Sequence, residues 1–171
     1  MDARLQKKSN GILLVLILVL FFSCSKDEEF NSPLVGNWNG ISYTTSAPVD
    51  ENMDGTAHTD LKQEMECVSI KASFTSRGNF TITSAEDTYD IDIINGEVIL
   101  THTGCSSYEE NGTWSLNESN TLLYLEFEIP GNPETTLVEV QIELSENHLV
   151  MKNLDYSEDG SITYTVEFER S

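Results

Sequence analysis

Hydrophobic and polar residues alternate with a period of two along most of this chain after residue 67. Such alternation predicts β-strands with one buried face and one face in water. Turn residues separate the alternating segments, and Asn95-Gly96 is the strongest two-residue hairpin signal among them. The segments are 68–74, 80–82, 89–93, 98–102, 114–116, 123–129, 138–144, 149–156 and 162–168. With an earlier strand near Trp38, the pattern predicts an all-β antiparallel meander of about ten short strands.

A meander of this length must protect its two edge strands. It does so either by closing into a β-barrel of about 8–10 strands or by splitting into the two packed sheets of a β-sandwich. The alternation is the same in both architectures, so both remain open at this point.

The pattern also predicts local details. Ile91 and Ile93 are expected on a buried face, with Asp90 and Asp92 outward, and Cys105 is expected in a loop of small residues. Residues 47–66 are expected to form a long polar excursion that ends in a short helix.

The segments 123–129 and 138–144 are expected to pair as a hairpin across the turn at Pro130–Pro133. A register with Glu126 opposite Glu139 keeps both apolar sets inward.

Aromatic residues lie mostly on the inward positions of the predicted strands. They fill the barrel core, or some of them line a pocket for an apolar ligand, because a barrel of this size holds either a solid core or one small ligand. The residues are Trp38, Phe74, Phe80, Tyr89, Trp114, Phe127, Tyr164 and Phe168.

The chain begins with a basic head followed by a short apolar run. Arg4, Lys7 and Lys8 precede eleven apolar residues at 12–22, about half the length of a membrane-spanning helix. This pattern is typical of a secretory signal, here residues 1–23, that is removed from the mature protein. Residues 20–24, LFFSC, resemble a lipobox, in which the Cys carries a diacylglycerol.

The lipobox implies a protein that is held at a membrane by the lipid on Cys24. Residues 24–33 are then a flexible tether and residues 34–171 one folded domain. The sequence SKDEE at 25–29 resembles the export signal of Bacteroidota-type lipoproteins, although a plain solvated linker has the same composition. The expected location is the outer membrane, with the domain exposed at the cell surface.

The chain is strongly acidic. Its 171 residues include 9 basic and 29 acidic side chains, for a net charge of −20. Removal of residues 1–23 takes away three basic residues and one acidic residue, which leaves a net charge of −22. Such a field repels the phosphates of nucleic acid, which excludes nucleic acid as a partner.

Cys67 and Cys105 remain after Cys24 is assigned to the lipid. An even pair in an oxidising compartment predicts a disulfide, with two buried thiols as the alternative. Neither Cys has a second Cys at close metal-ligand spacing, so a metal site is not expected here.

No catalytic motif is present, and His58, His102 and His148 are far apart in the sequence. An enzyme is therefore not expected. Asp50-x-Asn52-x-Asp54-Gly55 repeats the first half of a calcium loop, but position twelve is Leu61 where a bidentate Glu is required. The segment is either a Ca²⁺ site completed by Asp60, one residue early, or Glu64, which is late, or it is an acidic surface loop. No other cofactor is indicated.

Several motifs, taken in order, resemble the lipocalin-like domain of small bacterial lipoproteins. They are Gly36-x-Trp38, Cys67 before a strand-turn-strand, Cys105, Gly112-Thr113-Trp114-Ser115 and Tyr164-x-x-Glu167-Phe168-x-Arg170. The resemblance spans 34–170, and it implies a barrel in which Trp38 packs at the closed end beneath Arg170. The long acidic loop at 47–66 departs from the family pattern.

The fold does not identify a ligand. Two functions remain open. One is a surface module that binds a small apolar or glycan-derived molecule inside the barrel. The other is a structural lipoprotein with a filled barrel that docks to another envelope protein.

Overall fold

The computed structural model describes residues 31–128, 135–155, 157 and 160–171. The predicted signal at 1–23, the lipid site Cys24, the export motif and most of the tether lie outside the described residues, as does the turn at 130–134. In the described part, no helix is both long enough and apolar enough to cross a membrane.

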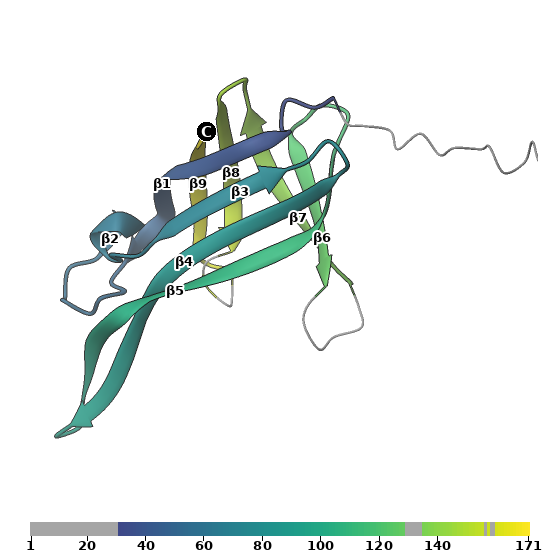
Figure 1. The fold of residues 1–171 in the computed structure, drawn as a ribbon. Coiled ribbons are helices and arrows are strands. Elements are labelled where there is room, and N and C mark those ends of the chain that lie inside the picture. Colours follow the sequence, from purple (N-terminus) through teal and green to yellow (C-terminus); the bar gives the residue numbers. More distant parts are fainter. Residues whose placement is uncertain (1–30, 129–134, 156, 158–159) are drawn as a thin grey trace, which may run out of the picture.

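The described chain folds as one antiparallel sheet that closes on itself (Figure 1). It contains nine strands and one 3₁₀ helix: β1 (Gly36–Val49), β2 (His58–Asp60), η1 (Leu61–Gln63), β3 (Ser69–Phe74), β4 (Asn79–Ile94), β5 (Glu97–Leu116), β6 (Leu122–Glu128), β7 (Thr135–Leu144), β8 (His148–Asp155) and β9 (Thr163–Arg170).

Each strand from β3 to β9 pairs with its neighbour in the sequence, and β1 pairs with both β3 and β9. These pairings close an eight-stranded barrel of β1 and β3–β9. The barrel prediction is confirmed, and the sandwich alternative is wrong. The ninth strand, β2, is a short addition that pairs with the distal half of β1 outside the closed ring.

The alternation seen in the sequence places apolar side chains inside the barrel. On β3, for example, Ala72 and Phe74 are buried, whereas Lys71 is exposed. One end of the interior is filled by aromatic rings: Phe74 packs edge-on against Trp114, with centroids 5.8 Å apart, and against Phe80 at 6.5 Å. This aromatic plug leaves the middle of the barrel to smaller aliphatic side chains.

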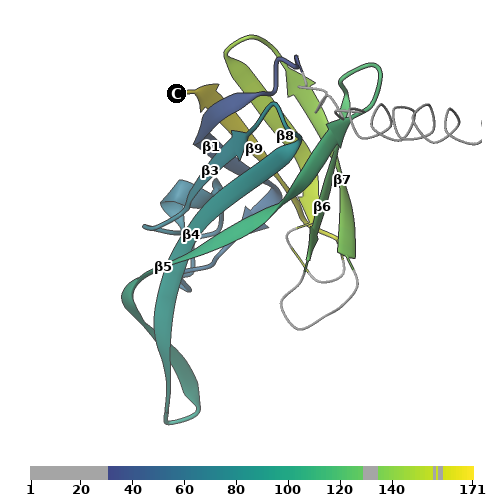
Figure 2. The same cartoon turned by 45° about the vertical axis from the view of Figure 1, so that its right-hand side comes forward.

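β4 and β5 are much longer than predicted. They form a hairpin that extends well beyond the barrel wall, as Figures 1 and 2 show. Two of the local expectations are therefore wrong. Cys105 lies within the continuous strand β5 and not in a loop, and Ile91 and Ile93 are 68% and 73% exposed.

The hairpin is continuous because a β-ladder is held by backbone hydrogen bonds, which small and polar residues form as well as apolar ones. The register runs from Asn79 opposite Thr113 to Ile94 opposite Glu97, with one irregularity between Thr88 and Tyr89.

The register of β6 and β7 also differs from the expectation. Tyr124 lies opposite Glu139, and Glu126 lies opposite Leu137. The observed pairing is shifted by two residues from the predicted one. A shift of two keeps the same side chains inward, so the hydrophobic pattern does not distinguish the two registers.

The polar excursion between β1 and β3 is partly ordered by its own hydrogen bonds. The Asp60 side chain accepts a hydrogen bond from the backbone of Lys62 and caps η1, while Leu61 of that helix is buried. The predicted short helix thus exists as a single 3₁₀ turn.

Candidate functional site

A cavity of about 290 Å³ lies inside the barrel. Its wall is built by inward-facing side chains of the seven consecutive strands β3–β9. The apolar members are Ile70, Ile82, Leu125, Phe127, Val138, Val140, Met151, Leu154, Val166 and Phe168. An apolar cavity with few polar groups is the usual form of a small-molecule site.

Three polar side chains complete the lining: Ser84, Glu110 and Tyr164. Glu110 lies opposite Ile82 in the β4–β5 ladder and shares its inward-facing side, because directly opposed residues project to the same face. Glu110 is solvent-exposed even though it lines the cavity. The carboxylate therefore stands at the mouth, and the apolar wall extends inward from it.

The surroundings of Tyr164 in the cavity wall raise the pKa of its phenol. Burial raises the pKa of the Tyr164 phenol above its ordinary value of 10.0, and the negative charge of Glu110 raises that pKa further. Tyr164 is partly buried, and the Glu110 charge acts on its phenol.

The closed end of the barrel is formed by Trp38 and Arg170, which are paired across β1 and β9. Trp38 is fully buried, and its indole nitrogen donates a hydrogen bond to the carbonyl of Leu34 at 2.8 Å. The guanidinium of Arg170 lies over the indole, with 4.5 Å from its central carbon to the ring centroid. These contacts close the barrel at the end opposite to the long hairpin.

Gly36 makes room for that arginine. Its φ is +143°, and a Cβ built on it would lie 2.6 Å from Nη1 of Arg170. The same Nη1 donates to the carbonyl of Val35 at 2.7 Å. The spacing Gly36-x-Trp38 therefore has a physical basis: the glycine admits the guanidinium that covers the tryptophan.

Cys67 and Cys105 form a disulfide that joins the end of the polar excursion to β5. Beside it, Asp87 has a fully buried side chain and accepts hydrogen bonds from the backbone of Glu66 at 2.9 Å and of Cys67 at 3.1 Å. Nε2 of His102 lies 2.9 Å from Asp87 and 3.8 Å from the Cys67 sulfur. The disulfide and these hydrogen bonds hold the end of the 47–66 segment against the β4–β5 hairpin.

Cys67, Asp87 and His102 are also the one group in the described chain whose ligand atoms gather closely enough for a metal, within 4.8 Å of one another. The disulfide consumes the thiolate that a metal would need, and the Asp87 oxygens already accept hydrogen bonds. In the oxidised protein this cluster therefore has a structural role.

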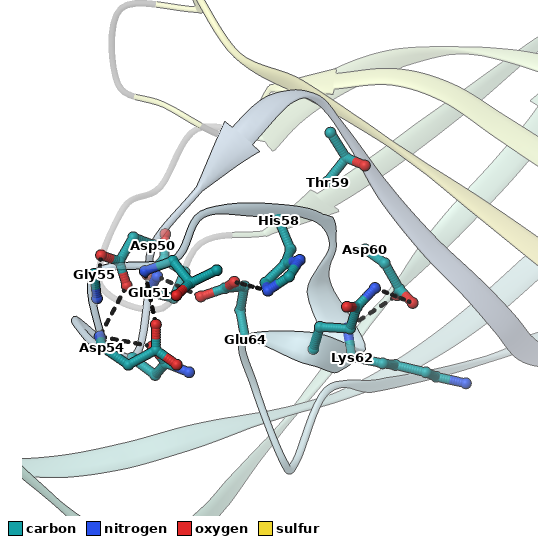
Figure 3. A network of polar contacts seen from close by, with 12 residues as sticks. Asp50, Glu51, Asp54, Gly55, His58, Thr59, Asp60, Lys62 and Glu64 are labelled. Carbon is teal, nitrogen blue, oxygen red and sulfur yellow. Dashed lines mark hydrogen bonds and ion pairs between the residues drawn. The ribbon is translucent and has the colours of Figure 1, made fainter.

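The acidic loop folds around its own side chains (Figure 3). The Asp50 carboxylate accepts hydrogen bonds from the backbone of Asp54 and of Gly55, both at 3.0 Å, and Asn52 also accepts from Asp54. A calcium loop has the same sharp turn at its glycine.

Glu64, the residue that follows η1, lies between that helix and the loop (Figure 3). It is 3% exposed, and its Oε2 accepts from the backbone of Glu51 at 3.2 Å. Its other oxygen lies 3.8 Å from Nε2 of His58 (Figure 3). Asp60, the other candidate for a closing ligand, is directed to the η1 cap. A calcium site completed by Glu64 remains a prediction.

The third histidine has a carboxylate neighbour of its own, since Nε2 of His148 lies 3.4 Å from Glu167. The three histidines therefore do not meet, and each has a different acidic neighbour. Their separation along the sequence left this arrangement open.

The chain matches no protein-family model and no curated protein sequence. The assignment of a function therefore rests on the geometry described above.

Sequence reasoning missed Glu110 because it began the strand at Trp114 and treated the preceding residues as a loop. Once β5 is known to be continuous, the alternation Glu110-x-Gly112-x-Trp114 carries the signal. Trp114 is buried inside the barrel, so Glu110, four residues earlier, is on the inward phase too.

Proposed function

We propose that this chain is a lipid-anchored, lipocalin-like protein of the bacterial envelope that binds a small apolar or glycan-derived molecule inside its barrel at the cell surface. The observation that carries the proposal is the apolar cavity enclosed by seven strands. A barrel that served only as a spacer would gain stability from a filled interior, because each unfilled methylene-sized space forfeits packing energy. The retained space supports a role in binding.

The anchor is supported by the signal-like segment at 1–23 and by Cys24. A tether of about ten residues spans at most about 35 Å when extended. It joins the barrel at the closed end, near Leu34 and Arg170, so the cavity and the long hairpin would face away from the membrane.

Binding is tested with n-octanol, whose apolar chain is smaller than the cavity. The full chain is held in phospholipid nanodiscs, and bound octanol is measured by equilibrium dialysis against empty nanodiscs. Val138→Trp fills the cavity from its wall, whereas Leu137→Trp places the same ring on the outer face, where Leu137 is 66% exposed. We expect the wild-type protein to bind octanol. Val138→Trp should abolish that binding, and Leu137→Trp should preserve it. Equal octanol uptake with and without protein would contradict the proposal.

The anchor has its own test. Cys24→Ser should abolish fatty-acid labelling of the protein in growing cells and block cleavage before residue 24. Equal labelling of mutant and wild type would contradict the lipoprotein assignment without bearing on the cavity.

A second function, docking to an envelope protein, is favoured by one observation on the hairpin. Ile91 lies opposite Leu100, and Ile93 lies opposite Val98, so these four side chains share one face of the projecting ribbon. Ile91, Ile93 and Val98 are all more than half exposed. A contiguous apolar face of this kind is typical of an interaction site.

The partner would present an apolar surface to these four side chains, because the acids at 90, 92 and 97 project from the opposite face of the ribbon. A photo-crosslinker at position 93 should give one discrete adduct in intact cells, and Ile91→Thr should remove it. A crosslinker at the exposed position Glu118 is the control. Adducts from position 118 that equal those from 93, or adducts that survive Ile91→Thr, would contradict docking through this face.

A further inference from the structure

The lining of the cavity carries negative charge and no positive charge. Glu110 is the single carboxylate among the lining residues, and none of the five lysine and arginine residues in the described part of the chain lines the cavity. Two of the five are engaged elsewhere: Arg170 covers the closed end of the barrel, and Lys152 pairs with Glu143. A negatively charged head group would therefore meet no opposite charge at the mouth.

A second carboxylate extends the negative surface along the hairpin. Tyr108, two residues before Glu110 on the same side of β5, donates a hydrogen bond to Glu86 on β4 at 2.9 Å. Glu86 is thereby fixed farther along the same wall. A low-dielectric cavity whose mouth carries charge of one sign focuses the field and concentrates ions of the opposite sign.

We propose that the preferred ligand of this cavity is a small amphipathic organic cation, with its apolar body inside the barrel and its ammonium head bound by Glu110. The inference rests on the binding function proposed above and adds the chemical class of the ligand. The volume of about 290 Å³ accommodates about ten non-hydrogen atoms, at the roughly 30 Å³ that a water-sized group occupies in a liquid. The ligand is therefore comparable to an octyl or decyl amine and smaller than a lipid.

The ammonium head gains a charge-assisted hydrogen bond at Glu110, and it keeps part of its hydration because that carboxylate is exposed. A carboxylate head on the same body would be repelled by Glu110. An alcohol would experience neither effect. The three head groups thus separate the contribution of charge from that of the apolar body.

The test compares octylammonium, n-octanol and octanoate at pH 7 and 150 mM salt, by equilibrium dialysis of the full chain in nanodiscs against empty nanodiscs. We expect octylammonium to bind at least tenfold more tightly than octanoate, with octanol between them. Glu110→Gln should weaken octylammonium binding to the level of octanol. Glu110→Lys should reverse the order, so that octanoate binds most tightly.

Glu109→Gln is the matched control. It removes the same charge from the adjacent outward position of β5, where Glu109 accepts a hydrogen bond from Asn111. It should leave all three affinities unchanged. An equal effect of Glu109→Gln and Glu110→Gln would show that the net charge of the chain attracts the amine and would overturn the assignment to Glu110.

The outcomes also separate the inference from the function on which it rests. Binding of octanol and octanoate at least as tight as that of octylammonium supports the cavity function and overturns the cationic preference. The failure of all three probes to bind overturns both.

Discussion

Arg170 on the last strand covers Trp38 on the first, with the guanidinium carbon 4.5 Å from the ring centroid. The arginine also donates hydrogen bonds to the carbonyls of Val35 at 2.7 Å, Glu146 at 2.8 Å and Pro33. One side chain thus ties together the entry to β1, the β7–β8 turn and the end of β9. The residues that close the ring of strands also close the end of the barrel.

Replacement of Arg170 by lysine keeps the charge and loses the planar fork of donors, so fewer carbonyls can be reached at once. We expect a loss of about 2 kcal/mol in the free energy of unfolding, measured by denaturant titration. Arg77→Lys, at an exposed turn position, is the control and should be neutral. A neutral result for Arg170→Lys would mean that the fork does not contribute to closure.

Gly36 can be compared with Gly96, which also has a positive φ but has no atom within 4 Å of a built Cβ. Gly96→Ala should cost about 1 kcal/mol from backbone conformation alone. Gly36→Ala adds the overlap with Arg170 and should cost clearly more, about 2–3 kcal/mol. Equal losses for the two variants in the same denaturant series would show that the arginine moves aside without penalty.

The disulfide joins residues 38 positions apart. On a chain-entropy estimate, a loop of that size contributes about 4 kcal/mol of stability by restricting the unfolded chain. Thiol titration of the folded, non-reduced protein should find neither Cys67 nor Cys105. Reduction should lower the melting temperature while leaving the β-sheet circular dichroism intact at 25 °C. Two titratable thiols at these positions would contradict the assignment.

The tyrosines predict sensitivity to alkali. Burial raises the pKa of Tyr164 above 10.0, and burial likewise raises the pKa of Tyr43 despite the hydrogen bond from Ile70. Above about pH 10, the unfolded chain loses these protons while the folded chain keeps them. The folded state then binds more protons than the unfolded state, so stability is unaffected below the unfolded pKa and falls as pH rises through it.

Tyr164→Phe should therefore flatten the decline of the unfolding midpoint between pH 9.5 and 11. Tyr108→Phe changes a tyrosine that is 51% exposed and serves as the comparison. A decline as steep in Tyr164→Phe as in wild type would contradict the contribution of that phenol.

The loop at Asp50–Gly55 predicts a calcium effect. If Glu64 or another carboxylate completes the site, calcium bound with a dissociation constant of about 1 mM should stabilise the fold by roughly 1.4 kcal/mol at about 10 mM. The melting temperature is measured in calcium and in sodium of matched ionic strength. Asp50→Asn should remove the difference, and Asp90→Asn on the exposed hairpin should not. Identical melting in the two salts would remove the calcium hypothesis.

The sequence by itself determined the fold class and which side chains share a face of a strand. Alternation at period two decides which side chains share a face, whatever the strand pairs with, so the antiparallel meander could be read directly from residues such as Val166 and Phe168. Trp38, Arg170 and the two cysteines could also be named in advance. The cysteine pair followed from the even number of cysteines left after Cys24, and Trp38 and Arg170 followed from the motif resemblance stated above.

Tertiary structure decided the strand register and the strand lengths, which the alternation of apolar and polar residues does not determine. The β6–β7 register shifts by two residues without moving any side chain to the other face, which is why Glu126 meets Leu137 and not Glu139. Backbone pairing with β4 carries β5 through small and polar residues that appeared to be a loop, and this places Glu110 at the cavity mouth.

The extension of the β4–β5 hairpin beyond the barrel also explains why its isoleucines are exposed to solvent. Ile91 and Ile93 have the alternation of a buried strand, but their part of the hairpin lies past the last neighbouring strand, so nothing in the described chain covers them. Periodicity shows that a strand has an apolar face. Only the arrangement of the other strands decides whether that face is turned to the core, to a ligand or to solvent.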